Sequence, residues 1–313
     1  MKLKFALMLL FTFAFDARSS SLDDSIFWEA NRDGKLVYVL GALHVGFEPQ
    51  YPVRGDIISA LRKSSVYVTE TFLPFLRAED VKTALKEAYS ARSGRTLNEL
   101  LETSQCGKLI RKEQFTNQLG LVYGTDVVRN FLDLSPRALI HILYSNGLTL
   151  NASNLNGRIK LAPPMEAYLR KQAGDLKSKI ESLDPEFWES IDLLTTDESC
   201  SLLSGLIGLN TSVKQSQELR INELVVAINY WSTGNSTELE KLHFLTSEAY
   251  SSEYAKAHHK WFDLRNRNMV EKILRISSRE SDPIFISVGA AHLAGSSGIL
   301  SLLREAGFTV QTK

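Results

Sequence analysis

The segment that decides the fold is Ile286–Leu303, which reads ISVGAAHLAGSSGILSLL. Apolar and small residues lead into Gly289, His292 follows three residues later, and helical spacing begins soon after. The segment Val37–Gly46, VYVLGALHVG, has the same order and places His44 where the later segment has His292. Both segments therefore predict a buried strand that ends in Gly-Ala-x-His, followed by a helix.

The residues on either side of Val37–Gly46 predict a hairpin before this segment and a helix and a second strand after it. Asn-Arg-Asp-Gly at 31–34 is a strong hairpin signal before the strand. Residues 53–65 have helical spacing, and 66–71, VYVTET, predict a strand that ends at Glu70. The chain end repeats the order, with a strand at 282–292, a helix stopped by Gly307, and a last strand.

Between the two units the pattern is mainly helical. Apolar residues recur at i, i+3 and i+4 in segments separated by Gly, Asn, Ser and Pro. We therefore predict an α/β fold in which a central mixed sheet is formed by the N- and C-terminal strand-GAxH-helix-strand units. Residues from about 76 to 252 would form a helical insertion or cap, and residues 20–313 would form a single domain.

The first residues differ from the rest of the chain. MKLK supplies two positive charges, an apolar run follows, and small polar residues come next, which is the order of a secretory signal at 1–19. A retained N-terminal anchor is the alternative. We expect an exported protein, periplasmic or secreted, with no integral membrane segment after signal removal. Lys plus Arg equals Asp plus Glu, 36 each, which argues against a nucleic-acid partner.

The two cysteines, Cys106 and Cys200, are too few for a disulfide scaffold and lack zinc-ribbon spacing. In an oxidising compartment they could pair. The sequence leaves pairing and separate burial equally open, and it does not determine the oligomeric state.

The strand-end histidines are the candidate metal ligands. Ligands bind beyond the carboxyl ends of strands in open α/β sheets, where His44 and His292 are predicted. Glu70 would lie beside His44 if their two strands pair in parallel. Two imidazoles and one carboxylate can hold a divalent ion and leave a position for water. The alternative is that each histidine is an ordinary loop residue with its hydrogen bonds satisfied.

Other residues near these motifs have candidate roles. Gly41 and Gly289 would permit the turns before the histidines. Ser296 and Ser297 precede a helix, as its N-cap or as a site for an anion such as a substrate carboxylate. Gly-Ser-Ser-Gly is not a nucleophile elbow, so a catalytic serine is not supported.

The helical segment Leu264–Ile273, LRNRNMVEKI, interrupts its apolar positions with two arginines and two asparagines. The ordinary interpretation is a solvated basic face. In the alternative, Arg265 and Asn266 turn inward to orient Glu70 or a substrate carbonyl. Spacing alone favours the solvated face.

Taken together, these segments resemble the TraB/PrgY/GumN family, which includes the TIKI metalloproteases. The resemblance is specific in VYVLGALHVG, VYVTET, WSTGN, LRNRNMVEKI and the segment from Val288 to Phe308. It spans nearly the whole mature chain and is looser in the helical middle. One departure is Ala42, where threonine is usual, which removes a candidate hydrogen bond behind the ligands.

The resemblance implies an α/β fold similar to erythromycin esterase and ChaN-like proteins, with a site of two Gly-x-x-His motifs and a glutamate. His44, His292 and Glu70 match these positions, and Arg265 with Asn266 match an Arg-Asn pair, which makes the inward orientation the expected one. In TIKI members the activity is metal-dependent proteolysis of secreted Wnt proteins, supported by manganese or cobalt. Zinc or iron is also compatible with such ligands.

The sequence thus predicts an exported metal-dependent hydrolase that acts on a peptide or protein substrate. Glu70 would bind the ion or act as general base, and Arg265 and Asn266 would position Glu70 or stabilise an oxyanion. Activity would fall below about pH 6 as imidazoles protonate. The alternatives are a non-catalytic peptide- or pheromone-binding protein of the TraB/PrgY type, and an esterase that acts on a small substrate.

Overall fold

The computed structural model describes most of the chain from Ile26 to the C-terminus. The predicted signal and His44 lie outside the described residues, as do parts of the predicted helical insertion. The described residues are 26–43, 46–70, 95–103, 105–123, 125–147, 160, 162–184, 193–211, 225–235, 237–239, 241–242 and 252–313.

The N-terminal hairpin forms as predicted. Strand β1 (Phe27–Arg32) pairs antiparallel with β2 (Lys35–Ala42), and Arg32 lies opposite Lys35. The two-residue turn places Asp33 at φ 52° and Gly34 at φ 79°. Positive φ at both positions defines the turn whose twist matches that of the flanking strands, and Asp-Gly adopts it readily.

The hairpin belongs to a six-stranded mixed sheet in the order β4-β3-β5-β2-β1-β6. Strands β2, β5, β3 and β4 run parallel to one another in neighbouring pairs, whereas β1 is antiparallel to both β2 and β6. The fold class is therefore α/β with a mixed sheet, as predicted. The other strands are β3 (Val66–Thr69), β4 (Lys179–Ser182), β5 (Ile284–Gly289) and β6 (Thr309–Thr312).

The strand order corrects one expectation. Strands β2 and β3 are not neighbours, because β5 from the chain end lies between them and pairs in parallel with both. The two units also differ, since β6 crosses to the far edge and pairs with β1. In addition, β4 forms one edge of the sheet within the stretch that the sequence predicted as helical insertion.

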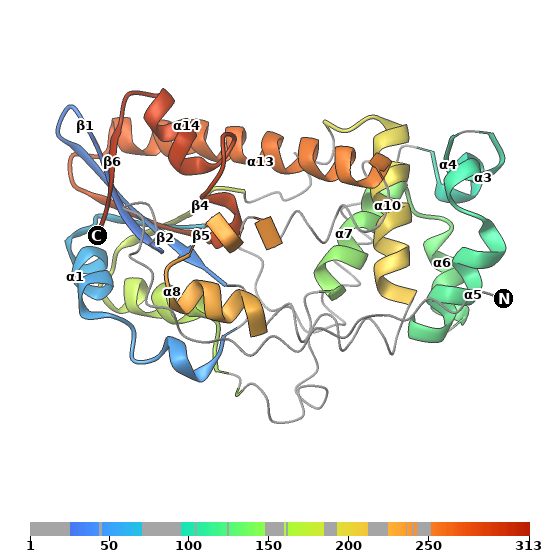
Figure 1. Cartoon of the computed structure of the whole chain (residues 1–313), viewed down its shortest axis with the longest axis horizontal. Helices are drawn as coiled ribbons and strands as arrows, with labels where there is room; N and C mark the ends of the chain where they lie inside the picture. The colour runs from blue at the N-terminus through green and yellow to red at the C-terminus, as the bar shows by residue number, and fades with distance from the viewer. Residues whose placement is uncertain are drawn as a thin grey trace, which may run out of the picture.

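Helices cover both faces of this sheet (Figure 1). On one face lie α13 (Ser252–Arg279) and α14 (Ile299–Glu305), whose Met269, Ile273 and Leu303 join a core with Val39 and Ile286. On the other face lie α1 (Gly55–Lys63) and α8 (Met165–Asp175), which share a second core with the sheet and with Trp231.

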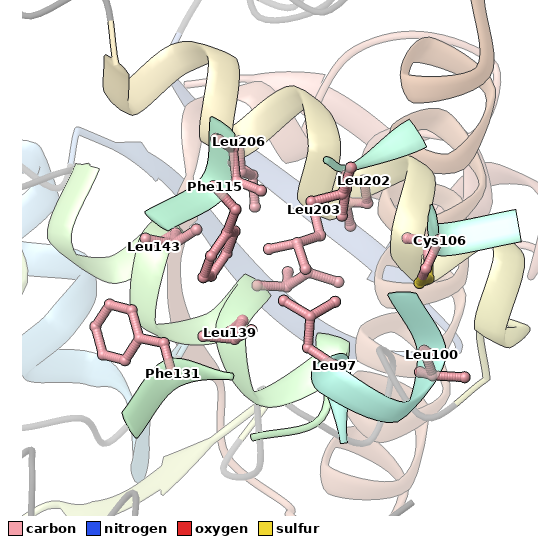
Figure 2. Close-up of a cluster of buried hydrophobic side chains, with 14 of the residues drawn as sticks. Leu97, Leu100, Cys106, Phe115, Phe131, Leu139, Leu143, Leu202, Leu203 and Leu206 are labelled. Carbon is pink, nitrogen blue, oxygen red and sulfur yellow. A yellow bond between two sulfur atoms is a disulfide. The ribbon is translucent and has the colours of Figure 1, made fainter. Parts of the chain in front are cut away.

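The remaining helices form a helical lobe, defined as α3, α4, α5, α6, α7 and α10, beside the sheet (Figure 1). Figure 2 shows its core, where leucine and phenylalanine side chains converge from these helices. Helix α13 joins the two parts, because its early residues Tyr254 and Trp261 lie in the lobe core and its later ones in the sheet core. The lobe helices are α3 (Leu97–Thr103), α4 (Gln105–Leu109), α5 (Lys112–Tyr123), α6 (Thr125–Phe131), α7 (Pro136–Gly147) and α10 (Thr196–Thr211).

The two cysteines are paired in this lobe. Cys106 of α4 and Cys200 of α10 form a disulfide that joins positions 94 residues apart, and both are fully buried. This resolves the alternative that the sequence left open. Of the helices in the described ranges, none combines the length and apolar character needed to cross a membrane.

Candidate functional site

The carboxyl ends of four parallel strands meet at one edge of the sheet, which we call the carboxyl edge. Glu70 directly follows β3, and a short 3-10 helix (Ala290–His292) directly follows β5. Because β3 and β5 are parallel neighbours, with Thr69 opposite Ser287, Glu70 lies beside the strand that carries His292. The sequence placed Glu70 beside His44 on the condition that β2 and β3 pair in parallel, and this condition is not met because β5 lies between them.

Glu70 is 3% exposed, and both of its carboxylate oxygens accept hydrogen bonds. Oε2 accepts from the backbone N–H of Gly289 at 2.7 Å, and Oε1 accepts from Nη2 of Arg265 at 2.6 Å. Oε1 also lies 3.6 Å from Nε2 of His292. The carboxylate is thus fixed between the end of one strand and the two side chains that the sequence indicated as its partners.

Arg265 is 2% exposed and lies at the centre of the site. Its Nε donates to Oδ2 of Asp184 at 3.0 Å, and its Nη1 lies 3.2 Å from Nε2 of His292. The guanidinium also approaches the ring of Trp261, at 5.3 Å from the centroid. One buried cation is therefore shared by two carboxylates, which compensates its loss of hydration.

Asp184 is a site residue that the sequence analysis missed. It follows β4 at the carboxyl edge, where the backbone N–H of Asp184 donates to the carbonyl oxygen of Glu70 at 2.7 Å. Asp184 is the second residue after β4, whereas Glu70 is the first residue after β3. The local sequence signal was weak, because KIES has little apolar character and lay inside a stretch interpreted as helical.

Asn266 fixes the protonation of His292. The Nδ2 of Asn266 donates to the carbonyl oxygen of Ser297 at 2.8 Å, so its Oδ1 is the atom that lies 2.5 Å from Nδ1 of His292. An amide oxygen only accepts, so Nδ1 of His292 carries a proton, and Nε2 keeps its lone pair because its neighbour Nη1 of Arg265 only donates. That lone pair points to the side of the ring on which Arg265 and Glu70 lie.

The imidazole of His292 is also held on its flat face. The ring of Phe262 is stacked on it at a centroid distance of 4.0 Å and an interplanar angle of 4°. His258 and Tyr254 continue the stack along α13, at 6.1 Å from Phe262 and 5.5 Å from His258 respectively. His258 therefore supports this column of rings inside the molecule.

Helical spacing explains why α13 supplies these groups. Positions 258, 262, 265, 266 and 269 share one face of a helix, and all five side chains are buried. Arg267 and Asn268 point the other way and are exposed. The inward orientation expected for Arg265 and Asn266 is correct, and the next two residues, Arg267 and Asn268, form part of the solvated face.

The structure gives the predicted glycines and serines other roles than those expected from the sequence. Gly41 lies within β2, where a Cβ would come within 2.6 Å of Leu293 Cδ1 and 3.2 Å of Ala290 Cβ. Gly289 has φ −51° and ψ 129°, which other residues adopt as well. Close packing, and not a turn, thus requires Gly41.

Ser297 and Ser296 do not cap the following helix, whose N-cap residue is Gly298 and has no side-chain cap. The hydroxyl of Ser297 donates to Oδ1 of Asp263, and its carbonyl oxygen binds Asn266. A carboxylate beside the serine disfavours an anion there. Ser297 instead ties the loop to α13, and Ser296 is exposed.

The predicted metal site is described in part, because His44 lies outside the described residues. Within those residues, no group of three or more His, Cys, Asp or Glu side chains is placed to hold a metal ion. The two described donors, Nε2 of His292 and Oε1 of Glu70, are of types that bind divalent ions and lie 3.6 Å apart, and each of them also contacts a guanidinium nitrogen of Arg265. With Asp184 and Arg265, the ionised side chains sum to one negative charge, which favours a cation.

The comparison with known families agrees with this arrangement of motifs. The model of the TraB/PrgY/gumN family matches residues 26–312, nearly the whole chain. No curated protein and no solved structure gives a significant match.

Proposed function

We propose that this chain, which belongs to the TraB/PrgY/gumN family, is an exported metal-dependent hydrolase that cleaves peptide bonds. The observation that carries the proposal is the polar cluster, defined as Glu70, Asp184, Arg265, Asn266 and His292, at the carboxyl edge. Buried ionisable groups arranged around one another at such an edge are a typical basis for catalysis.

The donor set supports a divalent cation at this cluster. Nε2 of His292 and Oε1 of Glu70 would hold it together with His44, which follows Ala42 of β2 by two residues in the sequence. Ala42 lies opposite Gly289, so the two Gly-Ala-x-His strands end side by side. A bound divalent ion supplies Lewis-acid chemistry and makes water a stronger acid. Manganese, cobalt, zinc and iron are the candidates.

In this proposal, each side chain of the polar cluster has a separate role in the reaction. Glu70 either helps to hold the ion or acts as general base, in which case it would accept a proton from the attacking water and return it to the leaving amine. Arg265 is placed to stabilise negative charge on the substrate carbonyl oxygen, and Asp184 keeps the guanidinium oriented. Asn266 and Phe262 hold the imidazole of His292 in one tautomer and one plane.

Export is supported by two separate features. The N-terminal residues have the order of a secretory signal. The disulfide between Cys106 and Cys200 is of the kind that persists in oxidising compartments. Determining the N-terminal residue of the protein recovered outside the cytoplasm tests this part, and a start at or near Ser20 is the expected result.

The experiment that tests the activity combines metal analysis with a peptide library. Purified protein is assayed with EDTA and after addition of manganese or cobalt, and the bound metal is quantified. We expect cleavage that stops with EDTA and resumes with metal, and a loss of at least about a hundredfold in Glu70→Gln and His292→Ala. Arg267→Gln is the matched control, since it changes an exposed cation two residues from Arg265.

Either of two other results would contradict the hydrolase proposal and support a different function. Peptides that are retained uncut, with or without metal, would identify a binding protein of the TraB/PrgY type. Hydrolysis of esters and not of peptides would favour an esterase, the alternative that follows from the erythromycin esterase-like fold implied by the family resemblance. Circular dichroism of each variant separates loss of activity from loss of fold.

A further inference from the structure

A separate cavity of about 310 Å³ lies at the same end of the sheet, on the side covered by α1 and α8. Its walls are partly apolar, from Ile26, Ile57, Met165 and Trp231, and partly polar. Cavities of this size are at the lower end of those that bind small molecules. The volume therefore suits one small group and not an extended chain.

The cavity is distinct from the polar cluster but connected to the same strand ends. Trp231, Ile57 and Met165 belong to the core between the sheet and helices α1 and α8, whereas Arg265 extends from α13 on the other face. The indole N–H of Trp231 donates to the carbonyl oxygen of Gly41 at 2.8 Å, near the end of β2. This places the cavity where ligands bind in such sheets.

Gln50 gives the cavity an unusual polar group. The side chain borders the cavity and is 3% exposed. Its Oε1 accepts a hydrogen bond from the backbone N–H of Phe47 at 3.2 Å. Within the part of the chain that the structure describes, its Nε2 has no hydrogen-bond partner. Buried amide groups are normally paired, so this donor points to an acceptor that the protein itself does not supply.

The other polar groups of the cavity are already engaged. Arg54 is bound through two nitrogens to Asp56, at 2.6 and 3.2 Å, so its charge is compensated. The hydroxyl groups of Ser232 and Thr233 donate to backbone carbonyl oxygens of the preceding helical turn. A ligand that matches this cavity is therefore a neutral group with one hydrogen-bond acceptor next to apolar surface.

We propose that this cavity is a binding subsite for an apolar amino-acid residue of a peptide. The peptide carbonyl oxygen accepts a hydrogen bond from Nε2 of Gln50 after the buried amide turns towards the cavity, and the apolar side chain contacts Ile57, Met165 and Trp231. The choice of a peptide as ligand rests on the function proposed above. The cavity and its amide donor do not depend on that function.

The test is an NMR titration of the metal-free, full-length protein with N-acetyl-leucine amide, compared with N-acetyl-aspartate amide. We expect saturable binding of the leucine compound with a shift of the Gln50 side-chain NH₂ resonance, and at least fivefold weaker binding of the aspartate compound. Gln50→Met should weaken leucine-amide binding by about fivefold to tenfold, as expected for one lost hydrogen bond.

A second variant tests the cavity without replacing Gln50, whose side chain also binds the backbone of Phe47. Ser232 is exposed at the cavity, so Ser232→Trp should block entry and abolish binding. Ser278→Trp is the control, because Ser278 is an exposed helical serine with the same type of backbone hydrogen bond. Absence of binding to wild type, or unchanged affinity in Ser232→Trp, would overturn the inference.

The two proposals fail in different ways. If the protein binds the leucine compound at Gln50 but cuts no peptide, the subsite remains and the hydrolase proposal is wrong. If it cuts peptides but the compound does not shift the Gln50 resonance, only the subsite is wrong.

Discussion

At the carboxyl edge of the sheet, one buried guanidinium is shared by two carboxylates, whereas the core of the helical lobe consists of apolar side chains and a disulfide (Figure 2). Replacing apolar side chains in a core usually costs packing in proportion to the volume lost. Breaking a buried ionic group instead leaves a charge without its partner, which is also strongly destabilising. The comparison teaches that the side chains at the carboxyl edge depend on pairing of charges, whereas those of the lobe depend on packing.

The largest expected effect comes from removing the central cation. Arg265→Met leaves Glu70 and Asp184 buried beside each other without their shared partner. The free energy of unfolding should fall by about 3–5 kcal/mol, measured by urea denaturation. Arg267→Met, on the exposed face of the same helix, should change it by less than about 0.5 kcal/mol. A loss below about 1 kcal/mol in Arg265→Met would show that the polar cluster is not held as described.

The next effect tests the lobe. Removal of the disulfide in Cys106→Ser with Cys200→Ser frees a loop of 94 residues in the unfolded chain. We expect the free energy of unfolding to fall by about 2–4 kcal/mol while the NMR signals of His292 stay in place. Dithiothreitol should destabilise the wild type and leave the double variant unchanged. A shift of the His292 signals would mean that the lobe and the site are not separable.

A smaller effect is expected from the ring stacked on His292. Phe262→Leu removes a parallel aromatic contact and should lower the free energy of unfolding by about 1 kcal/mol. The ring protons of His292 should shift markedly in the NMR spectrum because the ring current of Phe262 is lost. Phe115→Leu, equally buried in the lobe, should cost similar stability without moving those signals. Equal His292 spectra in both variants would contradict the stacking.

The smallest effect concerns the ion pair that joins the lobe to α13. The hydrogen bond from Lys260 lowers the pKa of Glu198 below its usual range. A lowered folded-state pKa stabilises the protein above the unfolded-state pKa of about 4.3, and this contribution is lost as the pH falls through the folded-state value. Glu198→Gln should therefore cost less than about 1 kcal/mol at pH 7, and the difference from wild type should shrink below about pH 4. A difference that grows towards low pH would contradict this sign.

Local patterns in the sequence predicted the turn and the strands whose conformation is set by residues close together in the sequence. The Asp33-Gly34 turn forms because both residues accept positive φ, and the strands before Glu70 and His292 are apolar runs bounded by turn residues. The family resemblance, and not spacing, indicated that Arg265 and Asn266 point inward. Spacing alone could not choose between the two faces, because arginine and asparagine are normally solvated.

The pairing of distant strands could not be predicted in this way. The insertion of β5 between β2 and β3 is set by packing of whole layers, and no local signal distinguishes it from β2 next to β3. Asp184 was missed for the same reason, because β4 is a four-residue edge strand with little apolar character. The role of Gly41 follows from Leu293, which is 252 positions away, and is invisible in a local pattern.

The position of β5 has a consequence for how the protein is made. The middle of the sheet comes from residues 284–289, so β2 and β3 have no parallel neighbour between them until these residues, more than two hundred positions later in the sequence, have left the ribosome. Contacts over such sequence distances form slowly, and the unpaired strand edges remain open to aggregation in the meantime. A nascent or truncated form that lacks the last thirty residues should therefore stay unfolded and be a substrate for chaperones and proteases.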